Sequence, residues 1–263
     1  MADPRTVLSM AVRFRCLFAL LALLGAGAAS AADWPAPIQQ MADKGLTIVK
    51  RFDAPGGLTG YAARAGHTPV ALYLTPDGHH VIVGTMLDEH GNNLSQKALD
   101  AIINKPQQQS AWAQLKAATW IADGADDAPR TIYVFTDPNC PYCHRFFEKA
   151  RPWVKAGKVQ LRTILVGVLK PSSPGKAAAI LAAKDPVAAF RRHEAHYRTG
   201  GIKPLANIPS KLADELSAND ALMTALAIRG TPGIVTRDAQ GHIHIHQGMP
   251  QGDALTDILG PRP

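Results

Sequence analysis

The sequence predicts a protein of the α+β class with two domains joined by a helical segment. Residues 33–94 alternate short β-type runs with turns, residues 95–124 change to a helical pattern, and residues 125–263 alternate strand-like and helix-like segments around two cysteines. The chain of 263 residues is long enough for two modest domains, each with its own hydrophobic core. These changes of pattern place the expected domain boundaries near residues 94 and 124.

Residues 1–32 are expected to be a secretory signal peptide. Arg13 and Arg15 precede the apolar run CLFALLALLGAGAA, and residues 29–31, Ala-Ser-Ala, offer a cleavage site between small residues. The apolar run is shorter than the roughly 18 residues that are needed to cross a bilayer. We therefore expect the mature protein to be exported.

The charge of the chain does not indicate a nucleic-acid site. The full chain has a net charge of +7, and because residues 1–32 hold three arginines and one aspartate, the remainder has a net charge of +5. Its basic residues are scattered, and no basic run is longer than a pair such as Arg191-Arg192. A solvated surface is the favoured interpretation, and no nucleic-acid partner is expected.

The cysteine count is the most informative part of the composition. Of three cysteines, Cys16 lies in the expected signal peptide, so the mature chain keeps only Cys140 and Cys143. A disulfide between them would close a very short loop, and the stabilisation from cross-linking decreases as the loop shortens. The pair is therefore a poor stabilising device and a good candidate for chemistry.

The first domain is expected to be rich in β-structure. The runs GLTIVKRF (45–52) and TGYAARA (59–65) are strand-like, and residues 71–86 form a hairpin around the turn Pro76-Asp77-Gly78. In residues 95–124 the pattern becomes helical, with Trp112, Leu115, Trp120 and Ile121 at approximate helical spacing. This segment is either a surface helix of one domain or a connector between the two, and the composition change on both sides favours the connector.

The second domain begins with a strand-like run, RTIYVFT (130–136), of the kind that is buried in the middle of a sheet. A helix follows the cysteines and ends near Gly157, and VQLRTILVGVL (159–169) supplies another strand. Helical segments are expected next, one of them capped by Asp185 with Pro186 at its first position, and a later one over residues 219–229. The remaining elements, in chain order, are the strand GIVT, the turn DAQG, the strand HIHIHQG and the short helix GDALTDIL.

The position of the two cysteines indicates thiol chemistry. Cys140 is expected at the N-terminus of a helix, where free backbone N–H groups and the helix dipole stabilise a thiolate. Thiolates are the attacking species in disulfide exchange, and Cys143, one turn later, could resolve a mixed disulfide. We therefore expect Cys140 to be the nucleophile and Cys143 the resolving thiol.

Further along the chain, Thr231-Pro232 precedes a strand. A cis bond there would bring Thr231 backbone groups close to the sulfurs, whereas the alternative is an ordinary turn.

Three segments resemble one family closely. YVFTDPNCPYC (133–143), the run from Arg151 to Pro174 and AAAILAAKDP (177–186) are similar to the DsbC/DsbG family of periplasmic thiol:disulfide isomerases, and the similarity covers almost all of the mature chain. The resemblance implies a cystatin-like N-terminal dimerisation domain at residues 33–94, a linker helix at 95–124 and a thioredoxin-like catalytic domain at 125–263. It also implies a helical insertion at about residues 171–229.

The resemblance further implies a function and its partners. The protein would be a periplasmic homodimer that reduces or isomerises disulfides of exported proteins, or reduces their sulfenic acids, and the membrane reductase DsbD would supply its electrons. Cys140 and Cys143 would be its redox pair and Thr231-Pro232 its cis-proline turn. Pro141 and Tyr142 are expected to contact the substrate together with Thr231 and Pro232. No cofactor and no metal ion are expected.

Three positions leave the local chemistry open. His144 stands where the family usually has lysine, and Asn139 where an aromatic residue is common; both could alter the pKa of Cys140. A protonated His144 would favour the thiolate, or the side chain could point to solvent. Asp137 is the nearest acidic residue, and we interpret it mainly as a turn or capping residue, with a role in proton transfer as the alternative.

Haem attachment and metal binding are two alternatives to disulfide exchange. Residues 140–144 also spell the C-x-x-C-H signature of c-type haem attachment, but the α/β pattern around them is unlike a compact helical haem fold. His242, His244 and His246 share one face of a strand, yet residues two apart on a strand lie too far from each other to share one ion without bending. His79 and His80 are expected in a surface turn. Net dithiol oxidase activity and a chaperone role that does not need the disulfide are the functional alternatives.

Overall fold

The computed structural model describes residues 34–263, so the expected signal peptide lies outside the described residues. The chain divides into two compact units, with the division between Leu87 and Asp88. Among residues 34–263 there is no helix with the length and apolar character of a membrane span.

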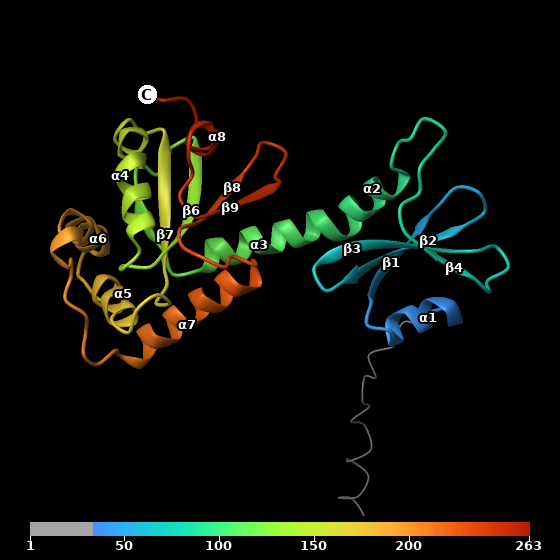
Figure 1. Cartoon of the computed structure of the whole chain (residues 1–263), viewed down its shortest axis with the longest axis horizontal. Helices are drawn as coiled ribbons and strands as arrows, with labels where there is room; N and C mark the ends of the chain where they lie inside the picture. The colour runs from blue at the N-terminus through green and yellow to red at the C-terminus, as the bar shows by residue number, and fades with distance from the viewer. Residues whose placement is uncertain (1–33) are drawn as a thin grey trace, which may run out of the picture. The chain divides into compact units, whose positions relative to one another are not determined.

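The first unit consists of one helix packed on a four-stranded antiparallel sheet with the order β1-β2-β3-β4 (Figure 1). Its elements are α1 (Ala36–Asp43), β1 (Thr47–Asp53), β2 (Thr59–Ala65), β3 (Thr68–Leu74) and β4 (Val81–Val83). The expected hairpin at residues 71–86 is confirmed as β3 and β4, and Gly78 takes the positive φ of +75° that its turn requires. Helix α1 was not expected from the sequence.

The core of the first unit lies between α1 and one face of this sheet. Ile38 of α1 is fully buried and packs with Tyr61 and Ala63 of β2 and with Leu72 and Leu74 of β3. The residues of each strand that belong to this core are two apart in sequence, because alternate side chains of a strand point to the same face. The unit therefore has a hydrophobic core of its own.

A continuous helical stretch begins the second unit. It comprises α2 (Leu94–Leu99), a π-helical turn η1 (Asp100–Asn104) and α3 (Lys105–Ala117), and the side chain of Asn93 caps it by accepting the N–H of Gln96 at 3.1 Å. Leu115 in its last turn is completely buried in the core of the second unit. The expected linker of residues 95–124 is too long at its C-terminal end, because Ile121 belongs to a strand of the second sheet and not to the helix.

The second unit is built on a five-stranded mixed sheet with the order β5-β7-β6-β8-β9. β6 and β7 are parallel and the other pairs are antiparallel. The strands are β5 (Ile121–Asp123), β6 (Arg130–Thr136), β7 (Val159–Leu165), β8 (Gly233–Arg237) and β9 (Ile243–Gln247). The helices that follow α3 are α4 (Pro141–Lys155), α5 (Ser173–Leu181), α6 (Pro186–Ala195), α7 (Ser210–Ala225) and α8 (Asp253–Leu259).

Strand β6 is buried on both faces, as its near-continuous apolar run predicts. Ile132 and Val134 pack against α4 and α8 on one face. Tyr133 and Phe135 pack against α3 and α7 on the other face. The helix that carries the two cysteines is therefore fixed to the central strand of the sheet, and its position is set by the hydrophobic core.

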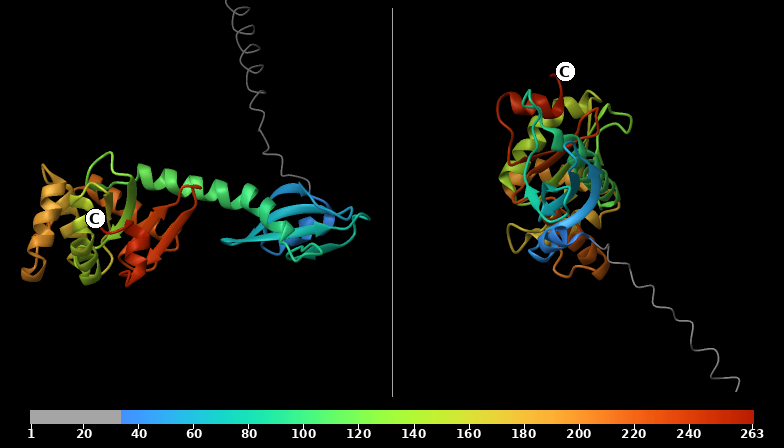
Figure 2. Two further views of the ribbon diagram at one scale, coloured as in Figure 1. Left: turned by 90° about the horizontal axis from the view of Figure 1, so that it is seen from above. Right: turned by 90° about the vertical axis from the view of Figure 1, so that its right-hand side faces the viewer.

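Helices α5, α6 and α7 form an insertion between β7 and β8, as the resemblance implies. α6 contacts β5 and α7 contacts β7. α5 and α6 lie away from β8 and β9 (Figures 1 and 2), whereas α7 packs in one core cluster with Val235 of β8 and Ile243 of β9. The predicted helix at residues 219–229 is α7, which begins earlier, at Ser210. Pro209 immediately before it is a helix-start signal, because proline has no N–H to lose at the first turn.

A buried carboxylate ties the insertion to α4 and β5. The side chain of Asp123 is 2% exposed, and its two oxygens accept from Arg151 of α4 and Arg191 of α6, each at 2.5 Å. Both bonds join ionised groups, which makes them stronger than neutral hydrogen bonds. The three elements are thus held together by one charged group that has no access to water.

We predict that Asp123→Ala lowers the free energy of unfolding by about 3 kcal/mol, because it leaves the partly buried guanidinium of Arg151 without its counter-ion. Urea unfolding of the mature protein measures this loss. The matched control is Glu215→Ala, which removes an exposed pair with Lys211 at 4.0 Å and is expected to change stability by less than about 0.5 kcal/mol. Equal losses in the two variants would contradict a structural role for Asp123.

Candidate active site

Cys140 lies where β6 passes into α4. It is the N-cap of the helix, and Pro141 occupies the first helical position, where its missing N–H costs no hydrogen bond. The N–H of Cys143 donates to the sulfur of Cys140 at 3.1 Å, so the thiol takes the place that a serine or aspartate oxygen fills in an ordinary N-cap. The sequence prediction that the first cysteine begins the helix is confirmed.

A segment 91 residues away in sequence closes the site from the other side. The Thr231–Pro232 peptide bond is cis, and the thiol of Cys140 donates to the carbonyl oxygen of Thr231 at 3.3 Å. The hydroxyl of Thr231 is buried and has no hydrogen-bond partner among the described residues. The turn before β8 therefore presents both a carbonyl and a hydroxyl group next to the redox pair.

The environment separates the acidities of the two thiols, which are free and nearly fully buried. The Cys143 thiol donates to the sulfur of Cys140 and is the main reason why the pKa of Cys140 is lowered to about 6. Burial opposes this shift, and Thr231 and the backbone N–H groups of Cys143 and Tyr142 assist it. Burial, followed by the hydrogen bond to Cys140 and its charge, raises the pKa of Cys143 well above its ordinary value. One thiol is prepared to attack while the other keeps its proton.

Asp137 organises the loop that leads to Cys140. Its buried carboxylate accepts four hydrogen bonds, all of 2.8 to 2.9 Å: from the backbone N–H groups of Asn139, Val168 and Leu169 and from the hydroxyl of Ser173. Because both oxygens are fully engaged, the geometry favours the turn interpretation over a role in proton transfer. The carboxylate fastens the active-site loop to the segment after β7.

Asn139 also connects the active-site loop to the insertion. Its amide nitrogen donates to the hydroxyls of Ser172 and Ser173 at 3.1 and 2.9 Å, and its amide oxygen accepts from Lys176 at 2.8 Å. An aromatic side chain at this position could make none of these bonds. Where an aromatic residue is common in the family, this chain therefore has Asn139 and a polar network around it.

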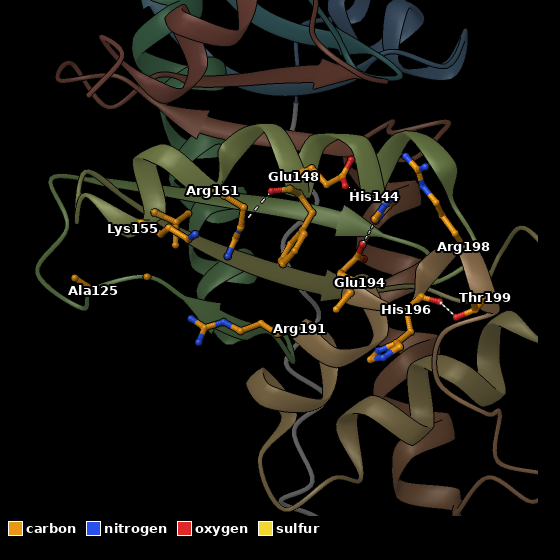
Figure 3. Close-up of a pocket in the computed structure, with 14 residues that line it drawn as sticks. Ala125, His144, Glu148, Arg151, Lys155, Arg191, Glu194, His196, Arg198 and Thr199 are labelled. Carbon is orange, nitrogen blue, oxygen red and sulfur yellow. Dashed lines mark hydrogen bonds and ion pairs between the residues drawn. The ribbon is translucent and has the colours of Figure 1, made fainter.

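His144 does not point to solvent, which excludes one of the two interpretations of this residue. Its side chain is 12% exposed; Nδ1 lies 2.6 Å from a carboxylate oxygen of Glu194, and Nε2 faces Glu148 at 3.6 Å (Figure 3). The ring stacks on Tyr197, with centroids 4.4 Å apart and an interplanar angle of 9°. With a carboxylate at each nitrogen, the imidazole is not available as an axial haem ligand, which counts against the haem alternative.

A cavity of about 720 Å³ lies between α4 and α6 (Figure 3). His144 and Glu194 line it at one end, and Arg151, Lys155 and Arg191 line it further along α4 and α6. Its lining combines these charged groups with apolar side chains such as Phe147 and Val154. The cavity gives water access to the His144–Glu194 pair from the side of the insertion.

Two of the four expected substrate contacts, Pro141 and Tyr142, are exposed beside the sulfurs, whereas Thr231 is half-buried and Pro232 is buried. Pro141 and Tyr142 lie on the surface, and the side chain of Tyr142 is 53% exposed. Val168 and Leu169, which the backbone bonds to Asp137 hold in place, are also half exposed. The sequence did not single out these two residues, because their exposure beside the active-site loop depends on the fold.

The other histidine-rich segments are arranged as surface groups. His242 and His244 both bond one oxygen of Asp238, at 3.1 and 3.0 Å, and His80 bonds Asp77 at 3.2 Å. Asp238 was not expected as their common partner; it lies in the turn before β9, which brings it close to both rings. Among residues 34–263 no three His, Cys, Asp or Glu side chains are arranged to hold a metal ion.

Sequence reasoning missed three residues that shape the site. Glu194, Tyr197 and His193 all come from α6 and the turn after it, and His193 bonds the carbonyl of Pro138 through Nε2 at 2.8 Å. In the sequence they form part of an ordinary polar helix, RRHEAHY. Only the docking of the insertion against the active-site loop gives them their partners.

Comparisons with known proteins agree with this site. A family model described as a thioredoxin-like domain matches residues 120–260. The chain is 48% identical to the thiol:disulfide interchange protein DsbG of Pseudomonas aeruginosa over 243 residues, which cover 92% of this chain and 95% of that protein. It is 44% identical to the protein of the same name from Escherichia coli K12, over 92% and 97% of the two chains. The E. coli K12 thiol:disulfide interchange protein DsbC is 30% identical over 83% and 85%. The expectation of a thioredoxin-like domain is confirmed.

We predict that Cys140 of the reduced protein is alkylated by iodoacetamide with a midpoint near pH 6, and that Cys143 remains unreactive up to at least its ordinary pKa of 9.0. Replacement of Cys143 by alanine removes the donor that lowers the pKa of Cys140 most, so the midpoint should rise by about one unit. Rates measured by mass spectrometry at each pH test this prediction. An unchanged midpoint in Cys143→Ala would contradict the assigned cause.

The same pKa predicts how the stability of the reduced protein changes with pH. Because the pKa of Cys140 is lower in the folded state than its ordinary value of 9.0, ionisation of this thiol stabilises the folded state. This contribution is complete above pH 9 and is lost as the pH falls through 6. Stability measured by urea unfolding should therefore rise between pH 6 and 9. Cys140→Ser should lose that rise, because a serine hydroxyl does not titrate in this range.

Proposed function

The chain belongs to the DsbC/DsbG family of thiol:disulfide interchange proteins, and from this premise we propose that it reduces or isomerises disulfides of exported proteins through Cys140 and Cys143. The observation that carries the proposal is the placement of the two thiols at the start of α4, where the N–H of Cys143 donates to the sulfur of Cys140 and the pKa values of the two thiols are shifted in opposite directions. A thiolate that is ionised at neutral pH attacks, and a buried thiol that keeps its proton waits to resolve the product.

The reaction proceeds through one mixed disulfide. The thiolate of Cys140 attacks one sulfur of a client disulfide; a bond between Cys140 and that sulfur forms, and the other client sulfur leaves as a thiolate. If another client thiolate then attacks the mixed disulfide, a new client disulfide forms and Cys140 is regenerated, which is isomerisation. If Cys143 loses its proton and attacks Cys140, the client leaves reduced and the protein holds a disulfide.

Sulfenic acids fit the same chemistry. The Cys140 thiolate attacks the sulfur of a client S–OH group, the hydroxide leaves and takes up a proton to become water, and Cys143 resolves the mixed disulfide as before. Thr231 supports this role because its buried hydroxyl has no partner among the described residues and lies beside Cys140. We propose that Thr231 and Pro232, with Pro141 and Tyr142, form the client-binding surface.

The direction of net electron flow depends on the redox potential. A lower thiol pKa stabilises the dithiol form, and the value of about 6 for Cys140 lies between the attacking thiols of thioredoxin, near 7, and DsbA, near 3.5. The potential should accordingly fall between about −270 and −120 mV. Isomerase and reductase activity require a reductant, and the resemblance implies the membrane reductase DsbD, acting in the periplasm. Net oxidation of dithiols is the second candidate and follows if no such donor keeps the pair reduced.

The first unit supports the proposed homodimer. β4 is an edge strand of its sheet, and Ile82 and Val83 on it are about half exposed, as is Leu87 shortly after it. Edge strands with exposed apolar side chains readily pair with another chain. We propose that this edge carries the dimerisation that the resemblance implies for a cystatin-like domain.

A trapping experiment tests the function. In Cys143→Ala the mixed disulfide cannot be resolved internally, so exported proteins should remain covalently attached to Cys140 and appear as high-mass bands that dithiothreitol releases. Clients with several cysteines would indicate isomerisation, and clients with a single cysteine would indicate reduction of sulfenic acids.

Cys140→Ser is the control and should trap nothing. If Cys140→Ser retains the activity of the protein toward unfolded clients, the chaperone alternative holds and the redox proposal fails.

A substitution in β4 tests the dimer. Ile82→Asp places a charge on the proposed interface and should convert a dimer into a monomer at micromolar concentration in sedimentation velocity experiments. Val49→Asp is the matched control, because Val49 is also a partly exposed apolar residue but lies on β1, the opposite edge strand. A wild-type protein that sediments as a monomer, or an Ile82→Asp variant that remains dimeric, would refute this interface.

A further inference from the structure

The insertion places a buried carboxylate against the active-site helix. The side chain of Glu194 is 2% exposed and bonds Nδ1 of His144 at 2.6 Å (Figure 3). His144 directly follows Cys143 and lies one turn after Cys140. A carboxylate is rarely buried to this extent unless a partner compensates for the loss of hydration, and here that partner is the imidazole.

A chain of direct contacts leads from Glu194 to Cys140. The ring of His144, oriented by its bond to Glu194, stacks on Tyr197. The hydroxyl of Tyr197 donates to the carbonyl oxygen of Asn139, the residue before Cys140, at 2.9 Å. Because each contact fixes the next group, a change at Glu194 would be transmitted to the turn that carries the reactive sulfur.

Glu194 and Cys140 are also linked through their charges. Burial raises the pKa of Glu194 to about 6, the hydrogen bond and charge of His144 oppose this, and the negative charge of Cys140 raises it further. Coupling between two ionisable groups is reciprocal: if the thiolate favours a proton on Glu194, that proton favours the thiolate. The two groups titrate in the same pH range, so each alters the ionisation of the other.

We propose that Glu194 is a positioning residue for Cys140. Through His144 and Tyr197 it holds the turn that carries the thiolate, and the proton that Glu194 shares with His144 couples the charge of the carboxylate to the charge of the sulfur. This inference rests on the proposed function, in which Cys140 is the nucleophile. As the shared proton leaves, a negative charge develops near Cys140 and opposes further ionisation of the thiol. Glu194 thus keeps Cys140 less acidic than the start of the helix alone would make it.

The surroundings of the pair provide the control. Glu148 faces the other nitrogen of His144 at 3.6 Å, but its side chain is 55% exposed and its charge is screened by water. The cavity beside the pair lets its proton exchange with solvent. The other charged or titratable groups that face the pair or line this cavity are Arg151 and Lys155 on α4, Arg191 and His193 on α6, and His196, Tyr197 and Arg198 after it.

The first test compares Glu194→Gln with Glu148→Gln in the reduced, full mature protein. Glutamine keeps a hydrogen bond to His144 but cannot ionise. In the wild-type protein, alkylation of Cys140 should follow a curve broader than a one-proton titration. In Glu194→Gln this curve should narrow to the width of a one-proton titration, and its midpoint should fall by about half a pH unit. At pH 7 the equilibrium with glutathione should then shift about threefold toward the dithiol form.

Glu148→Gln should leave both the midpoint and the width of the curve unchanged. If Glu194→Gln also leaves both unchanged, the inference is overturned. A purely structural role for Glu194 would reduce folding yield or stability without narrowing the titration of Cys140, and that result would overturn the inference as well.

The second test needs no substitution. The titration of Glu194 is followed by NMR, from its labelled carboxyl carbon, in the reduced protein and after Cys140 has been alkylated by iodoacetamide. Alkylation removes the thiolate charge, so the midpoint of the Glu194 titration should fall; a midpoint that does not move would overturn the inference. An ordinary, unshifted titration of Cys140 would refute the proposed function, whereas an acidic Cys140 that is insensitive to Glu194 would refute only the inference.

Discussion

The chemistry of this protein depends on the placement of one sulfur at the first turn of α4. There the N–H of Cys143 has no carbonyl partner within the helix, and it donates to the sulfur of Cys140. The thiol of Cys143 donates to the same sulfur, which stabilises the thiolate of Cys140 and keeps the proton on Cys143. One geometric constraint therefore assigns two different roles to two chemically identical side chains.

That placement is maintained by chain segments that are far apart in the sequence. Asp137 fastens the loop before Cys140 to the segment after β7 with four hydrogen bonds, and Thr231 approaches from the turn before β8. Asp123 joins β5 to α4 and α6 through two arginines. The carboxylates of Asp123 and Asp137 are buried and hydrogen-bonded, so loss of one partner would leave a charge or a polar group without compensation. The supports of the site are therefore polar as well as apolar.

Elements with a strong local signal could be predicted from the sequence. β6 and β7 were evident from their apolar runs, and α4 from the helical pattern behind the cysteines and the glycine after its end. Other elements were missed or misplaced for physical reasons. Trp120 and Ile121 continue the apolar spacing of α3, but the helix ends at Ala117, and Ile121 enters β5 instead, with Trp120 just before it. Helix α1 has only eight residues, too few to establish a helical period.

The sequence by itself determined that a thiol pair begins a helix behind a buried strand, because strand period, helix capping and the C-x-x-C spacing are all properties of neighbouring residues. It could not determine which distant groups complete the site. His144 meets Glu194 fifty residues away, and Cys140 meets Thr231 ninety-one residues away. Such partners are chosen by how the insertion and the last strands pack on the sheet, and packing depends on the shape of the whole core rather than on any local pattern. Tertiary structure alone therefore decided the environment in which the two thiols ionise.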